Sequence, residues 1–103
     1  MNVMSAPHSE AARILGSRIR EHRLAIQVSQ MDLADLASMH FTNLGKIERG
    51  EANPSLTTIV RIAVALDTDP GKLVAGIAGD DLPDRSHRVT AADLIRERQK
   101  GNS

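Results

Sequence analysis

The chain has 103 residues, 41% of them hydrophobic and 25% charged, and its 13 basic and 13 acidic residues give a formal net charge of zero. This length fits one domain with a tail and leaves no room for a separate catalytic domain. Cysteine is absent, which excludes disulfides, thiolate metal sites and a cysteine nucleophile. The four histidines have no partner at helical spacing, so a zinc-hydrolase helix is excluded too. These two exclusions leave no predicted metal or cofactor. We expect a soluble, cytoplasmic protein, because no apolar run reaches membrane-spanning length and no secretory signal is present.

Composition divides the chain into three segments. Residues 1–9 are short, polar and proline-containing, which indicates a flexible N-terminal arm. Residues 10–76 carry nearly all the periodic apolar positions. Residues 77–103 are rich in charge and begin with Gly, Asp and Pro, which is typical of a linker and tail. The sequence therefore predicts one compact all-α domain with a charged C-terminal extension.

The first half of residues 10–76 predicts two helices. One runs from about residue 10 to 26, with Leu15, Ile19, His22 and Ile26 on one face. Ser29 has Asp32 three residues after it, a capping-box pattern that starts a second helix over about 30–37.

Three further helices follow. A short break precedes a helix over 41–49, which stops at Gly50, a residue suited to the left-handed position after a helix. An Asn53-Pro54-Ser55 turn opens a helix over 56–66, and its inward stripe is Leu56, Ile59, Ile62, Ala63 and Leu66. Asp69-Pro70 caps a short fifth helix that carries Leu73 and Val74.

The second and third predicted helices carry the functional signal. Two short helices joined by a tight turn inside an all-α domain form a helix-turn-helix. At about 100° per residue, Leu44 and Ile47 of the third helix point toward the core, while Thr42, Lys46 and Arg49 point away. That outward face has hydrogen-bonding groups and cations without an acid, as a helix in the DNA major groove requires.

These segments resemble the lambda-repressor-like, Cro-type helix-turn-helix regulators, also called the xenobiotic-response-element family. The resemblance covers about residues 13–76 and rests on short segments spread along them: Arg20-Glu21-His22-Arg23, Val28-Ser29-Gln30, Leu33-Ala34, Ile47-Glu48-Arg49-Gly50, Asn53-Pro54-Ser55, Ile62-Ala63 and Ala65-Leu66. It implies a compact five-helix domain that binds DNA.

The resemblance also implies roles for individual residues. Arg23 and Glu48 match an ion pair between the first helix and the recognition helix; independently, an acid beside Leu44 is tolerable only with a partner. The expected base contacts are Phe41, Thr42, Asn43 and Lys46. The expected phosphate contacts are Ser29, Gln30, Arg49, Asn53 and Ser55.

Alternatives stay open at several of these positions. Phe41 is either a hydrophobic plug at the helix start or an apolar contact to a thymine methyl group. Thr42 and Asn43 either contact DNA or satisfy free N–H groups of the first turn. Gln27 stands where the family commonly has glycine, so the turn after the first helix is expected to be strained or differently shaped. Ser38 replaces the usual glycine of the helix-turn-helix turn, and His40 replaces a common Ser or Thr cap.

Residues 10–76 hold eight basic and eight acidic residues, so this segment has no net charge. Binding to DNA therefore requires that its cations gather on the DNA-binding face and its acids lie elsewhere. We expect the acids Glu51, Asp67 and Asp69 to lie away from the recognition face. So few cations favour a homodimer on a palindromic operator. Val60 and Val64, off the core stripe, are candidate dimer residues, as are Leu94 and Ile95 in a short helix over 91–99 that Thr90 and Asp93 cap.

The prediction is a sequence-specific transcriptional regulator that acts as a dimer at an operator, with control of a restriction–modification operon as one variant. The alternative is an antitoxin that binds DNA while its tail after Gly79 binds a protein toxin. An enzyme is nearly excluded, because the residues form no set of nucleophile, base and orienting group.

Overall fold

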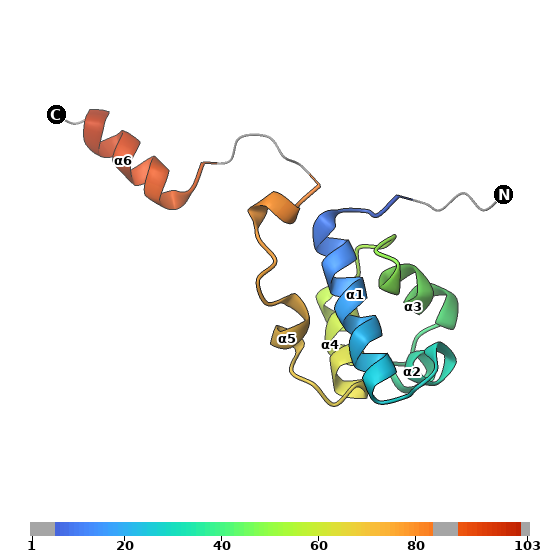
Figure 1. Cartoon of the computed structure of the whole chain (residues 1–103). Coiled ribbons are helices and arrows are strands. Elements are labelled where there is room, and N and C mark those ends of the chain that lie inside the picture. The colour runs from blue at the N-terminus through green and yellow to red at the C-terminus, as the bar shows by residue number, and fades with distance from the viewer. Residues whose placement is uncertain (1–5, 84–88, 102–103) are drawn as a thin grey trace.

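The computed structural model describes residues 6–83 and 89–101, and this part of the chain is helical without strands. The α-helices are α1 (Glu10–Ala25), α2 (Gln30–Leu36), α3 (Phe41–Glu48), α4 (Leu56–Ala65), α5 (Pro70–Val74) and α6 (Ala91–Gly101), and a single 3₁₀ turn, η1, spans Gly79–Asp81. Helices α1–α5 form one bundle, while α6 stands clear of it (Figure 1). The predicted all-α fold is confirmed, and the predicted helix ends agree to within one or two residues.

Local capping chemistry explains where the helices begin. The hydroxyls of Ser9, Ser29 and Ser55 accept hydrogen bonds from backbone N–H groups three residues later, at 3.0, 3.0 and 3.2 Å. Asp69 accepts in the same way from the N–H of Gly71, beside the proline that opens α5. These bonds satisfy N–H groups that a helix leaves free at its first turn.

Two of the tight connections are strained, and the one at Gln27 is the turn for which the sequence predicts strain or a different shape. Gln27, between α1 and α2, has φ +60°, and Ser38, between α2 and α3, has φ +56°. A side chain in this left-handed region costs about 1–2 kcal/mol, which glycine avoids. Gly50, at φ +75° after α3, occupies the left-handed position predicted for it. The bundle therefore holds non-glycine residues in strained turns that its packing enforces.

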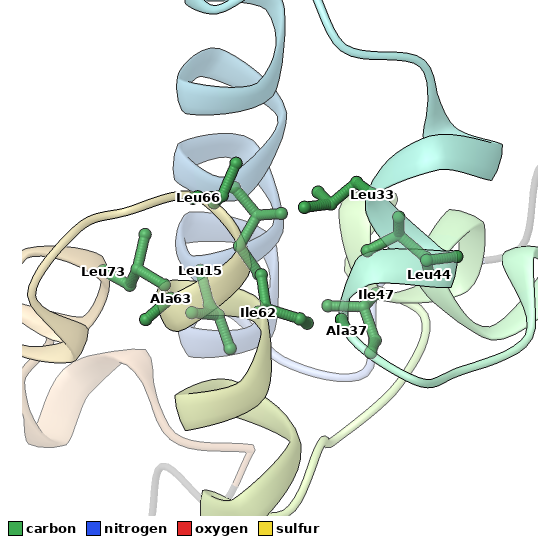
Figure 2. Close-up of a cluster of buried hydrophobic side chains, with 11 residues drawn as sticks. Leu15, Leu33, Ala37, Leu44, Ile47, Ile62, Ala63, Leu66 and Leu73 are labelled. Carbon is green, nitrogen blue, oxygen red and sulfur yellow. The ribbon is translucent and has the colours of Figure 1, made fainter.

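The core lies where all five helices of the bundle meet (Figure 2). Its fully buried large side chains come one from each helix: Ile19, Leu33, Leu44, Ile62 and Leu73. Helix α1 crosses the end of α3 so closely that a Cβ on Gly16 would lie 2.1 Å from the carbonyl oxygen of Ile47. Glycine is required there by contact, and this contact fixes the position of α3 against the bundle.

Three of the apolar residues assigned to the bundle helices are not in the core. Ile26 is 50% exposed because α1 ends at Ala25 and the chain turns away at that point. Leu56, predicted to face inward, is 75% exposed, since it is the first residue of α4 and lies at the edge of the bundle. Val74, at the end of α5, is 41% exposed. The inward stripe predicted for α4 is therefore correct only from Ile59 onward.

The two ends of the described chain behave differently. Residues 1–5 of the predicted arm lie outside the described residues, while the N–H of His8 donates to the carbonyl of Gly50 at 2.6 Å and holds that part of the arm against the bundle. Helix α6 has the predicted capping box, in which Thr90 and Asp93 exchange bonds of 3.1 Å, and it buries no residue. No helix in the described segments is long and apolar enough to cross a membrane.

Candidate nucleic-acid interface

A buried ion pair joins α1 to α3. The Nε of Arg23 donates to Oε2 of Glu48 at 2.7 Å and its Nη2 donates to Oε1 at 2.9 Å, with side-chain exposures of only 9% and 1%. The hydrogen bonds that Arg23 donates to Glu48, aided by the charge of that carboxylate, raise the pKa of Arg23 against the opposing effect of burial. A bidentate pair of this kind fixes distance and angle together, so it sets the tilt of α3.

The ion pair is part of a wider polar network that the sequence did not indicate. Nη1 of Arg23 donates to the carbonyl of Val28 at 3.0 Å, and Nε2 of Gln30 donates to Oε1 of Glu48 at 3.0 Å. Glu48 therefore receives donors from both α1 and α2. Three helices are tied at one carboxylate, which gives the α2–α3 pair a fixed geometry.

The N-terminus of α3 is capped by a histidine. Nδ1 of His40 accepts from the backbone N–H of Thr42 at 3.1 Å, and the ring of Phe41 stacks on that of His40 with centroids 4.9 Å apart. Phe41 is 46% exposed, so it does not plug the core. Because His40 accepts from the Thr42 backbone N–H, the Thr42 hydroxyl is not needed to cap the helix and is available for other contacts.

The outward face of α3 carries the residues expected to read bases. Thr42, Asn43 and Lys46 are exposed, and their side chains form no hydrogen bond or ion pair with other described residues. Leu44 and Ile47, on the opposite face, are buried. The helix therefore presents free donors, acceptors and one cation to solvent while its apolar side anchors it.

Arg49 and Glu51 form a contact that contradicts the predicted charge distribution. Glu51 was expected away from the recognition face, but its Oε2 lies 3.1 Å from Nη2 of Arg49 and also accepts from Nε at 3.2 Å. The turn after Gly50 brings the two side chains together. Part of the Arg49 guanidinium is thus engaged by an acid, while half of its side chain stays exposed.

The other residues expected at phosphates surround α3. Ser29 and Ser55 use their hydroxyls to accept the capping bonds of α2 and α4, Gln30 is held by Glu48, and Asn53 is exposed in the turn before α4. The Ser29 hydroxyl still has its own hydrogen to donate, while the Ser55 hydroxyl also shares a 3.0 Å hydrogen bond with the Thr58 hydroxyl, in which either oxygen can donate. Ser29 and Gln30 lie at the start of α2, and Asn53 and Ser55 lie in the turn before α4, so none of these four residues is on α3 itself.

The residues assigned to a dimer contact lie away from α3. Val60 and Val64 are on the exposed side of α4, and Leu94 and Ile95 are on α6. Leu36 and Leu56 join the two valines in lining one groove, which the sequence analysis missed. The spacing of Leu56, Val60 and Val64 by four residues was the available signal, because it places them along one helical face.

The described residues contain no group of three acids or histidines placed to hold a metal.

Comparisons with known proteins agree with this geometry. Residues 14–75 match the model of a helix-turn-helix domain family. Over 61 residues the chain is 38% identical to the control protein C.SmaI of Serratia marcescens, across 59% of this chain and 73% of that protein.

Solved structures show the same fold. The restriction-modification controller protein C.AhdI of Aeromonas hydrophila is 40% identical, with a TM-score of 0.59 over 60% of this chain and 94% of that one. The P22 c2 repressor, solved with a synthetic operator, is 25% identical, with a TM-score of 0.58 over 62% of this chain and 97% of that one. The chain therefore belongs to the helix-turn-helix domain family in its lambda-repressor-like form, and it is a DNA-binding regulator of transcription.

Proposed function

We propose that this regulator places α3 in the major groove of an operator, with Phe41, Thr42, Asn43 and Lys46 at the base edges. The observation that carries the proposal is the outward face of α3, whose hydroxyl, amide and ammonium groups have no partner among the described residues. Amide and hydroxyl groups pair with adenine or guanine edges, and the Phe41 ring suits a thymine methyl group. The tilt that the Arg23–Glu48 pair sets keeps this face turned outward.

Phosphate contacts from both sides of α3 would fix its register on the duplex. Ser29 and Gln30 supply donors from the start of α2, and Asn53 and Ser55 supply them from the turn before α4. Arg49 adds a cation whose charge Glu51 partly offsets. Such contacts orient a protein on DNA without reading its sequence.

The regulator acts as a homodimer on two half-sites. One neutral domain offers few cations for contacts to phosphates. A second copy doubles the contacts on a palindromic site whose two half-sites lie about 34 Å apart, centre to centre. Val60 and Val64 on α4 and Leu94 and Ile95 on α6 supply the contact, since all four are at least partly exposed apolar side chains away from the DNA-binding face.

The genes under its control are those of a restriction–modification system. This proposal is supported by the two relatives near 40% identity, one a control protein and the other a restriction-modification controller. The relatives named here favour this role over the antitoxin alternative. In this role the protein acts in the cytoplasm by occupying DNA, and it performs no chemistry of its own.

Selection of bound sequences from random DNA tests the operator proposal directly. We expect two related half-sites in inverted orientation, and we expect matching sites upstream of restriction–modification genes in the source genome. A single unrepeated half-site would contradict the dimer, while sites next to unrelated genes would contradict only the proposed target genes.

Lys46→Ala tests the role of α3 on the selected operator. We expect about 1–3 kcal/mol weaker binding in a gel-shift titration, because the change removes a groove contact, with Tm unchanged since Lys46 is exposed. Lys72→Ala is the matched control: it removes an exposed cation from α5, outside the proposed interface, and we expect near-normal affinity. Equal affinity of the Lys46 variant and the unchanged protein would overturn the placement of α3.

A further inference from the structure

The guanidinium of Arg49, the C-cap residue of α3, is folded back along the helix. A Cβ on Gly45 would lie 3.1 Å from Nη1 and 3.9 Å from Cζ of Arg49, so the guanidinium covers the turn that precedes its own Cα. Gly45 is buried under this cover, although it lies at the flank of the outward face. The charge of Arg49 therefore lies closer to the N-terminal half of α3 than its place in the sequence indicates.

Gln30, the first residue of α2, borders the same spot. Its Nε2 donates to Oε1 of Glu48 at 3.0 Å, and its own Oε1 would lie 3.6 Å from the same Cβ on Gly45. The buried carboxylate thus fixes the amide of Gln30 with its oxygen toward α3. The Arg49 guanidinium consequently lies beside the start of α2, where both helices of the helix-turn-helix are proposed to meet DNA.

Glu51 engages one edge of the Arg49 guanidinium and leaves another edge free. Oε2 of Glu51 accepts from Nε at 3.2 Å and lies 3.1 Å from Nη2, so it occupies the edge that these two nitrogens form. The end formed by Nη1 and Nη2 still presents a pair of parallel N–H groups. The Glu51 side chain is only 18% exposed, while that of Arg49 is 52% exposed. The acid therefore orients the arginine without using all of its donors.

We propose that Arg49 reads a guanine in each half-site, through hydrogen bonds from Nη1 and Nη2 to O6 and N7, and that Glu51 positions it. This inference rests on the proposed placement of α3 in the major groove, and it goes beyond the phosphate contact given to Arg49 there. Guanine presents O6 and N7 as neighbouring acceptors in that groove, and arginine is their commonest partner. Around the axis of α3, Arg49 lies about 20° from Thr42, so both residues face the same strip of the groove.

A phosphate contact alone accounts less well for this arrangement. Phosphates lie along the edges of the groove, whereas the Arg49 side chain is folded toward the middle of α3. A carboxylate 3.1 Å from the guanidinium also repels a phosphate. The same carboxylate fixes the direction of the free N–H groups, and direction is what hydrogen bonds to a neutral base edge require.

Selection of bound sequences from random duplex DNA tests the assignment. The unchanged chain is compared with Arg49→Ala and with the matched control Arg20→Ala, which removes an exposed arginine from α1. We expect the unchanged protein and the control to select the same guanine in each half-site, and Arg49→Ala to accept any base there. When an A·T pair replaces that G·C pair, we expect the unchanged protein to bind roughly 5- to 150-fold more weakly. We expect Arg49→Ala to bind both operators equally.

Glu51→Gln tests the positioning role by a ratio of affinities. The change keeps the shape of the side chain and removes a negative charge, so we expect tighter binding to unrelated DNA. We also expect the ratio between the affinities for the intact and the altered operator to fall several-fold, because Arg49 is no longer oriented. A purely structural effect would weaken binding to all three DNAs alike. An unchanged ratio would show that Glu51 does not position Arg49.

The other outcomes separate this contact from the placement of α3. An equal loss of affinity of Arg49→Ala on every operator would leave a phosphate contact and overturn the base contact. If Lys46→Ala weakens binding while Arg49→Ala keeps the guanine preference, only the assignment of Arg49 fails. If neither variant binds the operator more weakly than the unchanged protein, the placement of α3 fails as well.

Discussion

Helices α3 and α6 are short and amphipathic, yet they are held in different ways. Helix α3 buries Leu44 and Ile47 in the core, and Glu48 ties it to α1 and α2 through bonds of 2.7–3.0 Å. Helix α6 has a complete capping box and an ion pair between Asp93 and Arg96, and it buries nothing. Local capping alone is enough to define where a helix begins, but only burial fixes where its faces point.

Strain shows the same contrast between bundle and tail. The non-glycine residues with positive φ among those described are Gln27, Ser38 and Asp67, and all three lie in connections between bundle helices. The described tail from Val89 to Gly101 has none. Packing can hold a strained turn because many buried contacts depend on it, whereas a segment held by its own hydrogen bonds relaxes.

The largest expected effect comes from removing the buried carboxylate of α3. Glu48→Ala leaves the Arg23 guanidinium buried without its partner, and we expect the free energy of unfolding to fall by about 3–5 kcal/mol. Thermal unfolding followed by circular dichroism measures the change. Glu51→Ala is the matched control, because its partner Arg49 is half exposed and we expect a loss of at most about 1 kcal/mol. A Tm equal to that of the unchanged protein would contradict a structural role for the pair.

A smaller effect, in the opposite direction, is expected at the first strained turn. Gln27→Gly removes the steric cost of a side chain in the left-handed conformation. The glycine also makes the unfolded chain more flexible, which opposes part of this gain. We expect a net increase of about 0.5–1 kcal/mol in the free energy of unfolding. The same thermal measurement reports it. Glu21→Gly, at an exposed position inside α1, is the control and should destabilise by about the same amount, since its backbone is helical. If both changes destabilise equally, the turn is not strained.

The smallest effect is expected in α6. The hydrogen bond from the backbone N–H of Thr90 to the Asp93 carboxylate, aided by the Thr90 hydroxyl and Arg96, lowers the pKa of Asp93 below its ordinary value of 3.8. The cap is therefore fully formed above that value, and it is lost as the pH falls through the lowered pKa.

Chemical shifts of the α6 backbone measured by NMR across this acid range test the cap. We expect partial unwinding of α6 in acid with the first turn affected most. Asp93→Asn should remove this pH dependence, because an amide does not titrate. Acid unwinding of equal extent in that variant would show that the cap does not depend on the Asp93 charge.

Much of the fold could be predicted because its signals are local. Serine and aspartate caps, the proline of α5 and Gly50 set the helix ends within one or two residues. Leu56 and Ile26 were misplaced because periodicity alone does not show where the bundle stops covering a helix face. The Gln30–Glu48 bond and the Arg49–Glu51 pair join residues whose proximity depends on the turns between them, so the sequence pattern did not reveal them.

The sequence by itself determined the helix order, the outward polar face of α3 and the capped helix at the C-terminal end, because each follows from spacing within a few residues. Only the tertiary structure decided that Glu48 joins three helices, that Glu51 sits beside Arg49, and that α4 keeps an apolar groove uncovered. These features depend on how separate helices are placed against each other. That placement is fixed by the packing of the whole core and by close approaches such as the one at Gly16.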